Sequence, residues 1–503
     1  TAAKIVGSAD FTFNTVKVGL GTGSVGSNVA VGQSALHSTT SGPQNTGVGY
    51  GVLYANTTGG YNAAVGYGAL DANTTGSQNT AAGINALGSN TTANNNAAFG
   101  DRALASNTTG AQNVAVGGVS LNSNTTASSN TAVGYSALTA NTTGTPNTAV
   151  GYISLYSNTT GVDNTAVGAN CLAANTTGAY NTALGAYTLD GNTTGQQNVA
   201  IGRVALGAST TASYNTAVGD GALLSTTTGN HNTGVGLSAL YLNTTGTRNV
   251  AVGNYALDSN TTASDNTAVG CNTLAANTTG ANNTALGGEA LQLNTTGYQN
   301  TAVGFEALES NTDGYRNTAV GFESLEDNTT GDYNVGVGYR SLASNTTGNT
   351  NTAIGHASLE TSTTGLDNVA VGRSALQSNT TASYNTALGG YALTANTTAS
   401  YNSALGYSAL GANTTGSHNV AVGYYASQGS TTASDNVAIG VTAMNSTSTG
   451  STNVAIGKQA MYANTSGTQN VAIGGLALRT NTTSGQNTAV GTYALELNTA
   501  ADN

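Results

Sequence analysis

The stretch that decides the fold is residues 130–163, which read NTAVGYSALTANTTGTP and then NTAVGYISLYSNTTGVD. The second half matches the first at a distance of 17 residues. Working outward in both directions, an Asn recurs every seventeenth residue from Asn28 to Asn487, without insertion or deletion. The chain therefore contains 28 repeats over residues 28–503, and self-similarity at a fixed short period is typical of solenoids.

The repeat positions are numbered 1–17 from this Asn. Position 1 is Asn and position 5 is Gly in all 28 repeats, position 9 is Leu in 25, and position 13 is Thr in 27. A 17-residue unit is too short for two helices with their turns, whereas β-branched residues at positions 2 and 4 favour strands. We therefore predict an all-β fold, a parallel β-solenoid (β-roll) of 28 coils with 17 residues per coil.

Within each coil, strands are expected near positions 1–4 and 7–10, with a third near 12–14. Stacked Asn side chains such as Asn45 and Asn62 should form a ladder of amides between coils. Gly49 and Gly66 should take positive φ at a corner. Leu53 and Leu70, together with the Val of position 4, should point inward and form the core. The Ala columns at positions 3 and 8 are then interpreted as a flat face where chains meet, which predicts a homotrimer.

Residues 1–27 break the repeat and are predicted to be an N-terminal cap or junction segment. Phe11, Phe13, Val16, Val18 and Leu20 alternate with other residues as in a strand. The solenoid proper is assigned to residues 28–503. A solenoid end needs a cap, because its open edge would otherwise associate with other chains.

The composition excludes several classes of protein. Charged residues are 6% of the 503 residues, against about 25% in ordinary globular proteins, and only ten residues are basic. This is not the electrostatic footprint of a nucleic-acid-binding protein. No apolar run reaches the roughly 18 residues that a membrane span needs. The four His residues lie far apart, and no catalytic set or phosphate-binding loop is recognisable, so we predict that the protein is not an enzyme and needs no cofactor.

The unit N-T-A-V-G-Y-x-A-L resembles the N-S-V-A-I-G-x-x-S motif of YadA-like heads in trimeric autotransporter adhesins. The longer form N-T-T-G-x-x-N-T-A-V-G is similar to repeats of phage and marine-virus tail fibres, which often carry a C-terminal chaperone of the endosialidase type that is absent here. The resemblance covers residues 28–503 and implies a structural fibre, an adhesin or tail-fibre shaft or head, used for attachment or surface recognition. It implies an extracellular, cell-surface or virion location. The 17-residue period departs from the shorter adhesin repeat, so the coil geometry cannot be copied.

Two groups of side chains are candidate sites. Position 7 holds Glu289, Glu306 and Glu323 in successive repeats, and position 10 holds Glu309 and Glu326. Stacked carboxylates repel unless they are protonated, screened or bridged, so this patch is a candidate site for Ca²⁺ or a similar hard cation; the alternative is a solvated acidic patch partly offset by Arg340. Position 6 gathers tyrosines that could contact a cell-surface glycan or a protein, or cover seams between chains. These are Tyr67, Tyr135, Tyr152, Tyr339, Tyr407 and Tyr424.

An ice-binding β-solenoid is the alternative function, because Thr recurs at position 13 (Thr57, Thr74, Thr91). Ice-binding faces usually carry Thr-x-Thr, however, and adjacent Thr residues of one strand point to opposite faces. The Asn-Thr-Thr tripeptides at Asn56, Asn73, Asn107 and Asn141 match the N-glycosylation acceptor. A plain turn is favoured there, because Ser or Thr replaces this Asn in some repeats.

Overall fold

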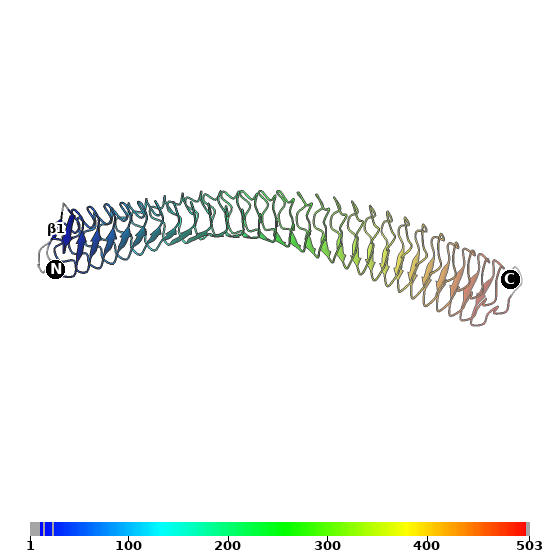
Figure 1. Cartoon of the computed structure of the whole chain (residues 1–503). Helices are drawn as coiled ribbons and strands as arrows, with labels where there is room; N and C mark the ends of the chain where they lie inside the picture. The colour runs from blue at the N-terminus through cyan, green and yellow to red at the C-terminus, as the bar shows by residue number, and fades with distance from the viewer. Residues whose placement is uncertain (1–10, 14–15, 23–24, 499–503) are drawn as a thin grey trace, which may run out of the picture. The chain divides into compact units, whose positions relative to one another are not determined.

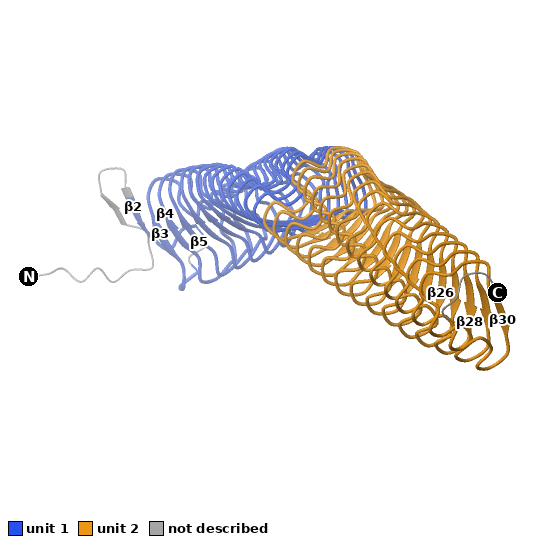
Figure 2. Ribbon diagram, turned by 90° about the vertical axis from the view of Figure 1, so that its right-hand side faces the viewer, with its two compact units in different colours: residues 1–248 blue, residues 249–503 orange. Residues whose placement is uncertain are grey.

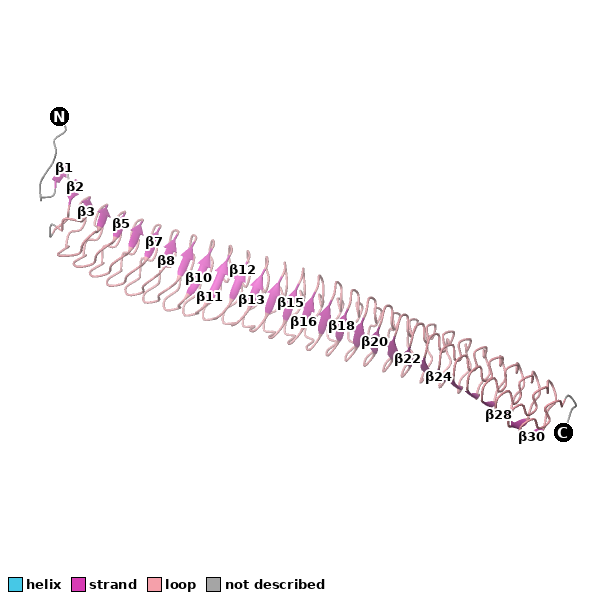
Figure 3. Cartoon of the chain, turned by 90° about the horizontal axis from the view of Figure 1, so that it is seen from below, coloured by secondary structure: helices cyan, strands magenta, loops and turns pink. Residues whose placement is uncertain are grey.

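The computed structural model describes residues 11–13, 16–22 and 25–498. It is a parallel β-solenoid of about 27 turns with 17 residues per turn, as the sequence predicts, and it divides into two compact units, residues 1–248 and 249–503 (Figure 2). Each repeat contributes one short strand. The remainder of each coil consists of turns and bends, and Figure 3 shows the strands side by side within each unit with the loops closing every coil.

In the first unit two strands precede the repeats, and thirteen repeat strands follow. Their bounds are β1 Phe11–Phe13, β2 Val16–Gly19, β3 Val29–Val31, β4 Thr46–Val48, β5 Ala63–Val65, β6 Thr80–Ala82, β7 Ala97–Phe99, β8 Val114–Val116, β9 Thr131–Val133, β10 Asn147–Val150, β11 Asn164–Val167, β12 Thr182–Leu184, β13 Val199–Ile201, β14 Thr216–Val218 and β15 Thr233–Val235 (Figure 1). Neighbouring repeat strands pair parallel and in register, so that like positions stack directly.

The second unit contains the other fifteen repeat strands, which also pair parallel and in register. Their bounds are β16 Val250–Val252, β17 Thr267–Val269, β18 Thr284–Leu286, β19 Thr301–Val303, β20 Thr318–Val320, β21 Val335–Val337, β22 Thr352–Ile354, β23 Val369–Val371, β24 Thr386–Leu388, β25 Ser403–Leu405, β26 Val420–Val422, β27 Val437–Ile439, β28 Val454–Ile456, β29 Val471–Ile473 and β30 Thr488–Val490.

The N-terminal segment supplies two strands where the sequence indicated one. β1 pairs antiparallel with β2, and β2 pairs antiparallel with β3, the strand of the first coil. The outer edge of β3 is therefore occupied by β2, which leaves fewer unpaired backbone groups at that edge. The first ten residues of the predicted cap lie outside the described residues.

The core differs from the prediction in which apolar side chain points inward. Ala at position 3 and Leu at position 9 are buried, as at Ala64, Leu53 and Leu70, whereas Val65 at position 4 is 49% exposed. Side chains alternate along a strand, so a buried Asn at position 1 places position 3 inside and positions 2 and 4 outside. The prediction that position 4 fills the core is wrong, and so is the prediction that the Ala of positions 3 and 8 form an outer face.

The predicted second strand at positions 7–10 is also absent from the described coils. Positions 7 and 9 have positive φ, for example 56° at Ser136 and 53° at Leu138, and extended backbone cannot include such residues. The segment still bonds to the next coil, since the Leu138 amide donates to the Ser154 carbonyl at 2.9 Å. It therefore forms a hydrogen-bonded turn rather than a strand.

Gly at position 5 takes the positive φ that the sequence predicts. At Gly134 φ is 137°, and a Cβ there would lie 2.3 Å from the carbonyl oxygen of Gly151 in the next coil. The close stacking of coils at this corner, as well as the backbone conformation, requires glycine.

Two Asn ladders run through the interior. At position 1, the Asn62 amide N–H donates to Oδ1 of Asn45 at 3.0 Å, and its Nδ2 donates to the Gly76 carbonyl at 2.9 Å. At position 12, Asn73 Nδ2 donates to Asn56 Oδ1 at 2.8 Å and to the same Gly76 carbonyl. The predicted ladder at position 1 is confirmed. At position 12 the Asn side chain also closes a turn in its own coil, since its Nδ2 donates to the carbonyl three residues on, so the turn that the sequence favours is present. Asn56, Asn73, Asn107 and Asn141 are fully buried and closed to glycosylation in the folded chain.

Candidate functional site

Within each unit, the outer face of the strands is a continuous surface of β-branched and apolar side chains. Position 4 is apolar in all 28 repeats, and in-register pairing stacks these residues directly, as Val167, Leu184 and Ile201 do across β11, β12 and β13. Leu184 is 47% exposed and Leu286 is 48% exposed. A long contiguous apolar column on a protein surface marks an interaction site more often than isolated apolar residues do.

Position 2 adds a second outward column beside the first. It holds Thr, Val, Ala or Ser, and Thr148 and Thr165 are typical. Together the two columns form a grid of about 4.8 Å between coils and about 6.6 Å along the strand. No charged residue occurs at either position in any of the 28 repeats, so this face is uncharged and regular.

The Thr column at position 13 does not supply such a surface. The Thr57 hydroxyl donates to the Thr74 carbonyl of the next coil at 3.0 Å, and Thr74 donates in the same way to Thr91 at 3.1 Å. These hydroxyls tie neighbouring coils together. The Thr hydroxyls on which the ice-binding interpretation was based therefore already donate hydrogen bonds to the backbone of the neighbouring coil.

The position-6 tyrosines are all exposed, from 44% at Tyr407 to 58% at Tyr135. Where two follow each other, their rings stack: Tyr135 and Tyr152 have centroids 6.0 Å apart, and Tyr407 and Tyr424 5.8 Å. Tyr67 stacks on Tyr50 at 5.2 Å. The structure thus brings the predicted recognition residues together in pairs rather than in one patch.

The longest ladder at position 6 includes residues that the sequence interpretation missed. Phe305, Phe322, Tyr339 and His356 follow one another in four successive coils, with ring centroids 5.7, 5.5 and 5.1 Å apart. The prediction from the sequence considered only the tyrosines of position 6. The signal was nevertheless available, because all four residues share one repeat position.

The acidic patch is partly assembled as predicted. Glu306, Glu309 and Glu326 each place one carboxylate oxygen within 4.8 Å of the others, a spacing that a shared cation could bridge. Partial burial and the neighbouring carboxylates of Glu323 and Asp327 raise the pKa of Glu326 to about 7. Burial, followed by Glu306 and other acidic neighbours, also raises the pKa of Glu309. Glu289 lies outside this group of three.

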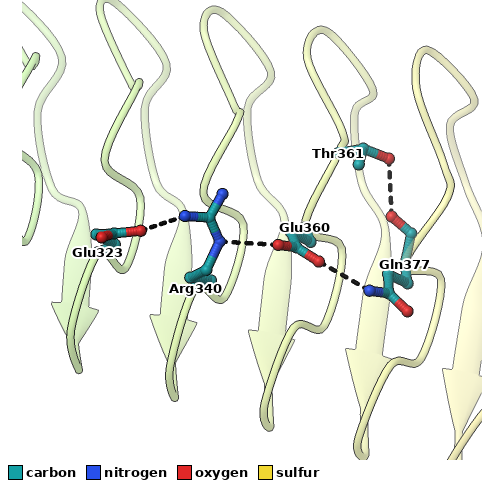
Figure 4. A network of polar contacts seen from close by, with 5 residues as sticks. All are labelled: Glu323, Arg340, Glu360, Thr361 and Gln377. Carbon is teal, nitrogen blue, oxygen red and sulfur yellow. Dashed lines mark hydrogen bonds and ion pairs between the residues drawn. The ribbon is translucent and has the colours of Figure 1, made fainter.

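Glu323 has a different partner. Figure 4 shows Arg340 between Glu323 and Glu360, and its Nε donates to Glu360 Oε1 at 2.8 Å. Gln377 Nε2 donates to the other Glu360 oxygen at 2.8 Å. Although partial burial acts in the opposite direction, the hydrogen bonds from Gln377 and Arg340 lower the pKa of Glu360. This chain of contacts balances the charges of Glu323 and Glu360 without a metal ion.

No protein-family model and no curated protein matches the chain. The resemblance to adhesin heads and tail fibres thus rests on the repeat motifs alone. Within the described residues, no helix is long and apolar enough to cross a membrane.

Proposed function

We propose that this chain is the shaft or head of a non-catalytic extracellular or virion fibre, used for attachment or surface recognition, in which three copies pack together through the outer faces of their strands. The single observation that carries the proposal is the position-4 column, which is apolar in every repeat yet outward in every described coil. The number three comes from the resemblance to trimeric adhesin heads.

Exposed apolar area is unfavourable by about 25 cal/mol per Å², and a second strand face laid on this column would remove it from water. Sheets that pack face to face do so at about 10 Å, with side chains of the two faces interdigitating. The uncharged, regular grid of positions 2 and 4 fits that kind of contact. The loop side of the coil carries most of the charges and aromatic rings instead, and it stays free for recognition.

The chain contains no Trp, which allows a direct test. Phe99 lies at position 4 and is 43% exposed in the single chain. In the Phe99→Trp variant the only indole would sit in the contact between chains. We expect blue-shifted emission and weak quenching by iodide, because the ring is withdrawn from water.

The matched control is Thr92→Trp, at the exposed position 14 of the preceding repeat. Its indole should emit as a solvated ring and be quenched freely. If iodide quenches the indole of the Phe99→Trp variant as strongly as that of the control, the strand face is open to solvent and the proposed packing is wrong.

An ice-binding role is the second candidate, and the same face now favours it. Outward residues at positions 2 and 4 repeat as Thr-x-Val or Val-x-Val on successive in-register strands, as in β14 and β16. This arrangement supplies the two outward residues per strand that position 13 does not. Such a role needs a free face, so it requires a monomer that shows thermal hysteresis in freezing solution; an associated particle without hysteresis excludes it.

A further inference from the structure

Separate shallow depressions on the loop side of the coils, lined by residues of positions 7, 10 and 11, occur in both units. In the second unit, one depression of about 390 Å³ is lined by Tyr255, Asp258, Asn272 and Ala275, among others. In the first unit, another of about 420 Å³ is lined by Tyr187, Asp190, Asn170 and Ala173. These volumes lie at the lower end of those typical of small-ligand sites.

The two depressions share one arrangement of side chains. One coil supplies Tyr at position 7 and Asp at position 10, and the adjacent coil supplies Asn at position 7 and Ala at position 10. Because the Ala is small, the space beside the carboxylate stays open. The order of the coils is reversed between the two sites: Asp258 precedes Asn272, whereas Asp190 follows Asn170.

The pairing of these residues is selective within the chain. Asp occurs at position 10 in only three of the 28 repeats (Asp71, Asp190 and Asp258), and Asn occurs at position 7 in only three (Asn85, Asn170 and Asn272). Each of the three Asp residues lines the same depression as one of the three Asn residues. In the third depression the coil of Asp71 has Gly68 at position 7 and so supplies no Tyr ring, and Arg102 of the coil beyond Asn85 also lines the site.

The carboxylates at the two Tyr sites have no side-chain partner among the described residues. Asp190 and Asp258 are half-buried, and neither makes an ion pair or a hydrogen bond to another side chain in the described part of the chain. The Asp190 carboxylate also accepts from the backbone at residues 190 and 191, whereas Asp258 has no such contact within residues 25–498. Partial burial without a neighbouring cation raises the pKa of Asp258. Tyr187 is 49% exposed and Tyr255 is 42% exposed, so a ring face is accessible beside each carboxylate.

We propose that these two depressions each bind one neutral pyranose unit of a glycan, with the Asp carboxylate and Asn carboxamide holding adjacent hydroxyls and the Tyr ring lying against the C–H face of the sugar. This inference deepens the attachment role proposed above and rests on it, but not on the number of chains.

The donor and acceptor set favours a sugar over other ligands. A carboxylate only accepts hydrogen bonds, whereas a carboxamide both donates and accepts, and neighbouring sugar hydroxyls can satisfy both. An ammonium ligand offers donors alone and would leave the Asn amide N–H groups unpaired. A Ca²⁺ ion needs six to eight oxygen ligands, and each depression presents one carboxylate.

The test is saturation-transfer NMR on the full chain with methyl glycosides of glucose, galactose, mannose and N-acetylglucosamine, and with ethylammonium as the cationic probe. We expect transfer to at least one glycoside and none to ethylammonium. In the Asp190→Asn/Asp258→Asn variant the glycoside signal should fall at least about fivefold, because charge-assisted hydrogen bonds are lost. The folded coil tolerates this change, since Asn122 and Asn445 occupy position 10 elsewhere.

The matched control is Asp163→Asn/Asp435→Asn, which makes the same charge change at exposed position-17 sites, one in each unit. It should keep the full signal. A second variant, Tyr187→Ser/Tyr255→Ser, should also lose signal, and Ser occurs naturally at position 7 in Ser238 and Ser374. The inference is overturned if no glycoside gives transfer, if ethylammonium does so instead, or if the signal survives in the Asp190→Asn/Asp258→Asn variant.

The particle mass measured on the same sample separates this inference from the fibre proposal. Three-chain particles that bind no glycoside would overturn the inference alone. Single chains that bind a glycoside through Asp190 and Asp258 would overturn the fibre and leave the inference standing.

Discussion

Gly134 leaves no room for a side chain, because a Cβ there would overlap the carbonyl of Gly151 in the next coil. Its φ of 137° is also one that other residues avoid. We predict that Gly134→Ala lowers the local opening free energy by about 3 kcal/mol, the upper range for backbone strain. Amide hydrogen exchange measures this coil by coil, which suits a solenoid that opens in parts.

The control for this substitution lies one repeat earlier. Gly118 is at position 6, and a Cβ there would make an ordinary contact of 3.4 Å with the Tyr135 ring. Gly118→Ala should therefore leave the protection of the backbone amides from hydrogen exchange near its present value. Equal loss in both variants would show that the corner glycine has no special role.

The position-12 ladder breaks where Ser or Thr replaces Asn. Oδ1 of Asn192 is buried without a hydrogen-bond partner, and the next residue in its column is Ser209. Ser209→Asn would place a carboxamide donor beside that oxygen. We expect a gain of about 1 kcal/mol in local stability, the usual net value of one buried hydrogen bond.

Hydrogen exchange of residues 192–226 would measure that gain. Ala208→Asn adds the same side chain at the exposed neighbouring position and should change nothing. A gain in Ala208→Asn, or none in Ser209→Asn, would contradict the ladder as a source of stability.

At the scale of coils, the acidic patch makes local stability depend on pH. The pKa of Glu326 is raised to about 7 in the folded state, above the unfolded value near 4.5, so protonation favours the folded coil. The stabilisation is complete below pH 4.5 and is lost as the pH rises through about 7. Protection of residues 306–327 should therefore increase as the pH is lowered from about 8 to about 5.5.

Two variants check the sign of this effect. Glu326→Gln should raise protection at about pH 8 and flatten the pH dependence. Glu360→Gln should lower protection at the same pH, because the pKa of Glu360 is depressed and its charge stabilises the fold. Parallel responses of the two variants would mean that the pH effect arises elsewhere.

The predicted cation patch is tested on the same residues. Added Ca²⁺ at about pH 8 should increase protection around Glu306, Glu309 and Glu326 in the parent chain, because a bound ion would relieve their repulsion. The Glu309→Gln/Glu326→Gln variant should not respond. An unchanged parent chain would leave a solvated acidic patch as the correct interpretation.

Much of each coil could be predicted from the repeat, since the period, the parallel stacking, the position-1 Asn ladder and the position-5 Gly corner follow from columns that hardly vary. Which strand side chains point inward could not be predicted in this way. Val at position 4 is larger than Ala at position 3, so its size predicted that it is the buried one. The buried Asn at position 1 instead sets the alternation of the strand, which turns Ala30 inward and Val48 outward. The turn at positions 7–10 depends on positive φ at residues such as Leu53. Leucine seldom adopts positive φ, so the residue type does not predict this turn.

The candidate sites were less predictable than the coil, because they combine residues from different repeat positions. Glu306 and Glu309 lie three residues apart in one repeat. Whether their carboxylates come close to that of Glu326 depends on the backbone path of the turn, which the sequence does not give. The Asp258–Asn272 depression combines positions 10 and 7 of adjacent coils. Such a pair has no sequence spacing that identifies it before the coil is built.

For the whole molecule, the central claim is that the apolar strand faces are covered by other copies of the chain. The native mass of the particle, measured by light scattering or native mass spectrometry at physiological salt, tests it most directly. We predict the mass of three chains of 49.3 kDa each. A particle with the mass of one chain would contradict the claim, leave the grid of positions 2 and 4 open to solvent, and favour the ice-binding alternative.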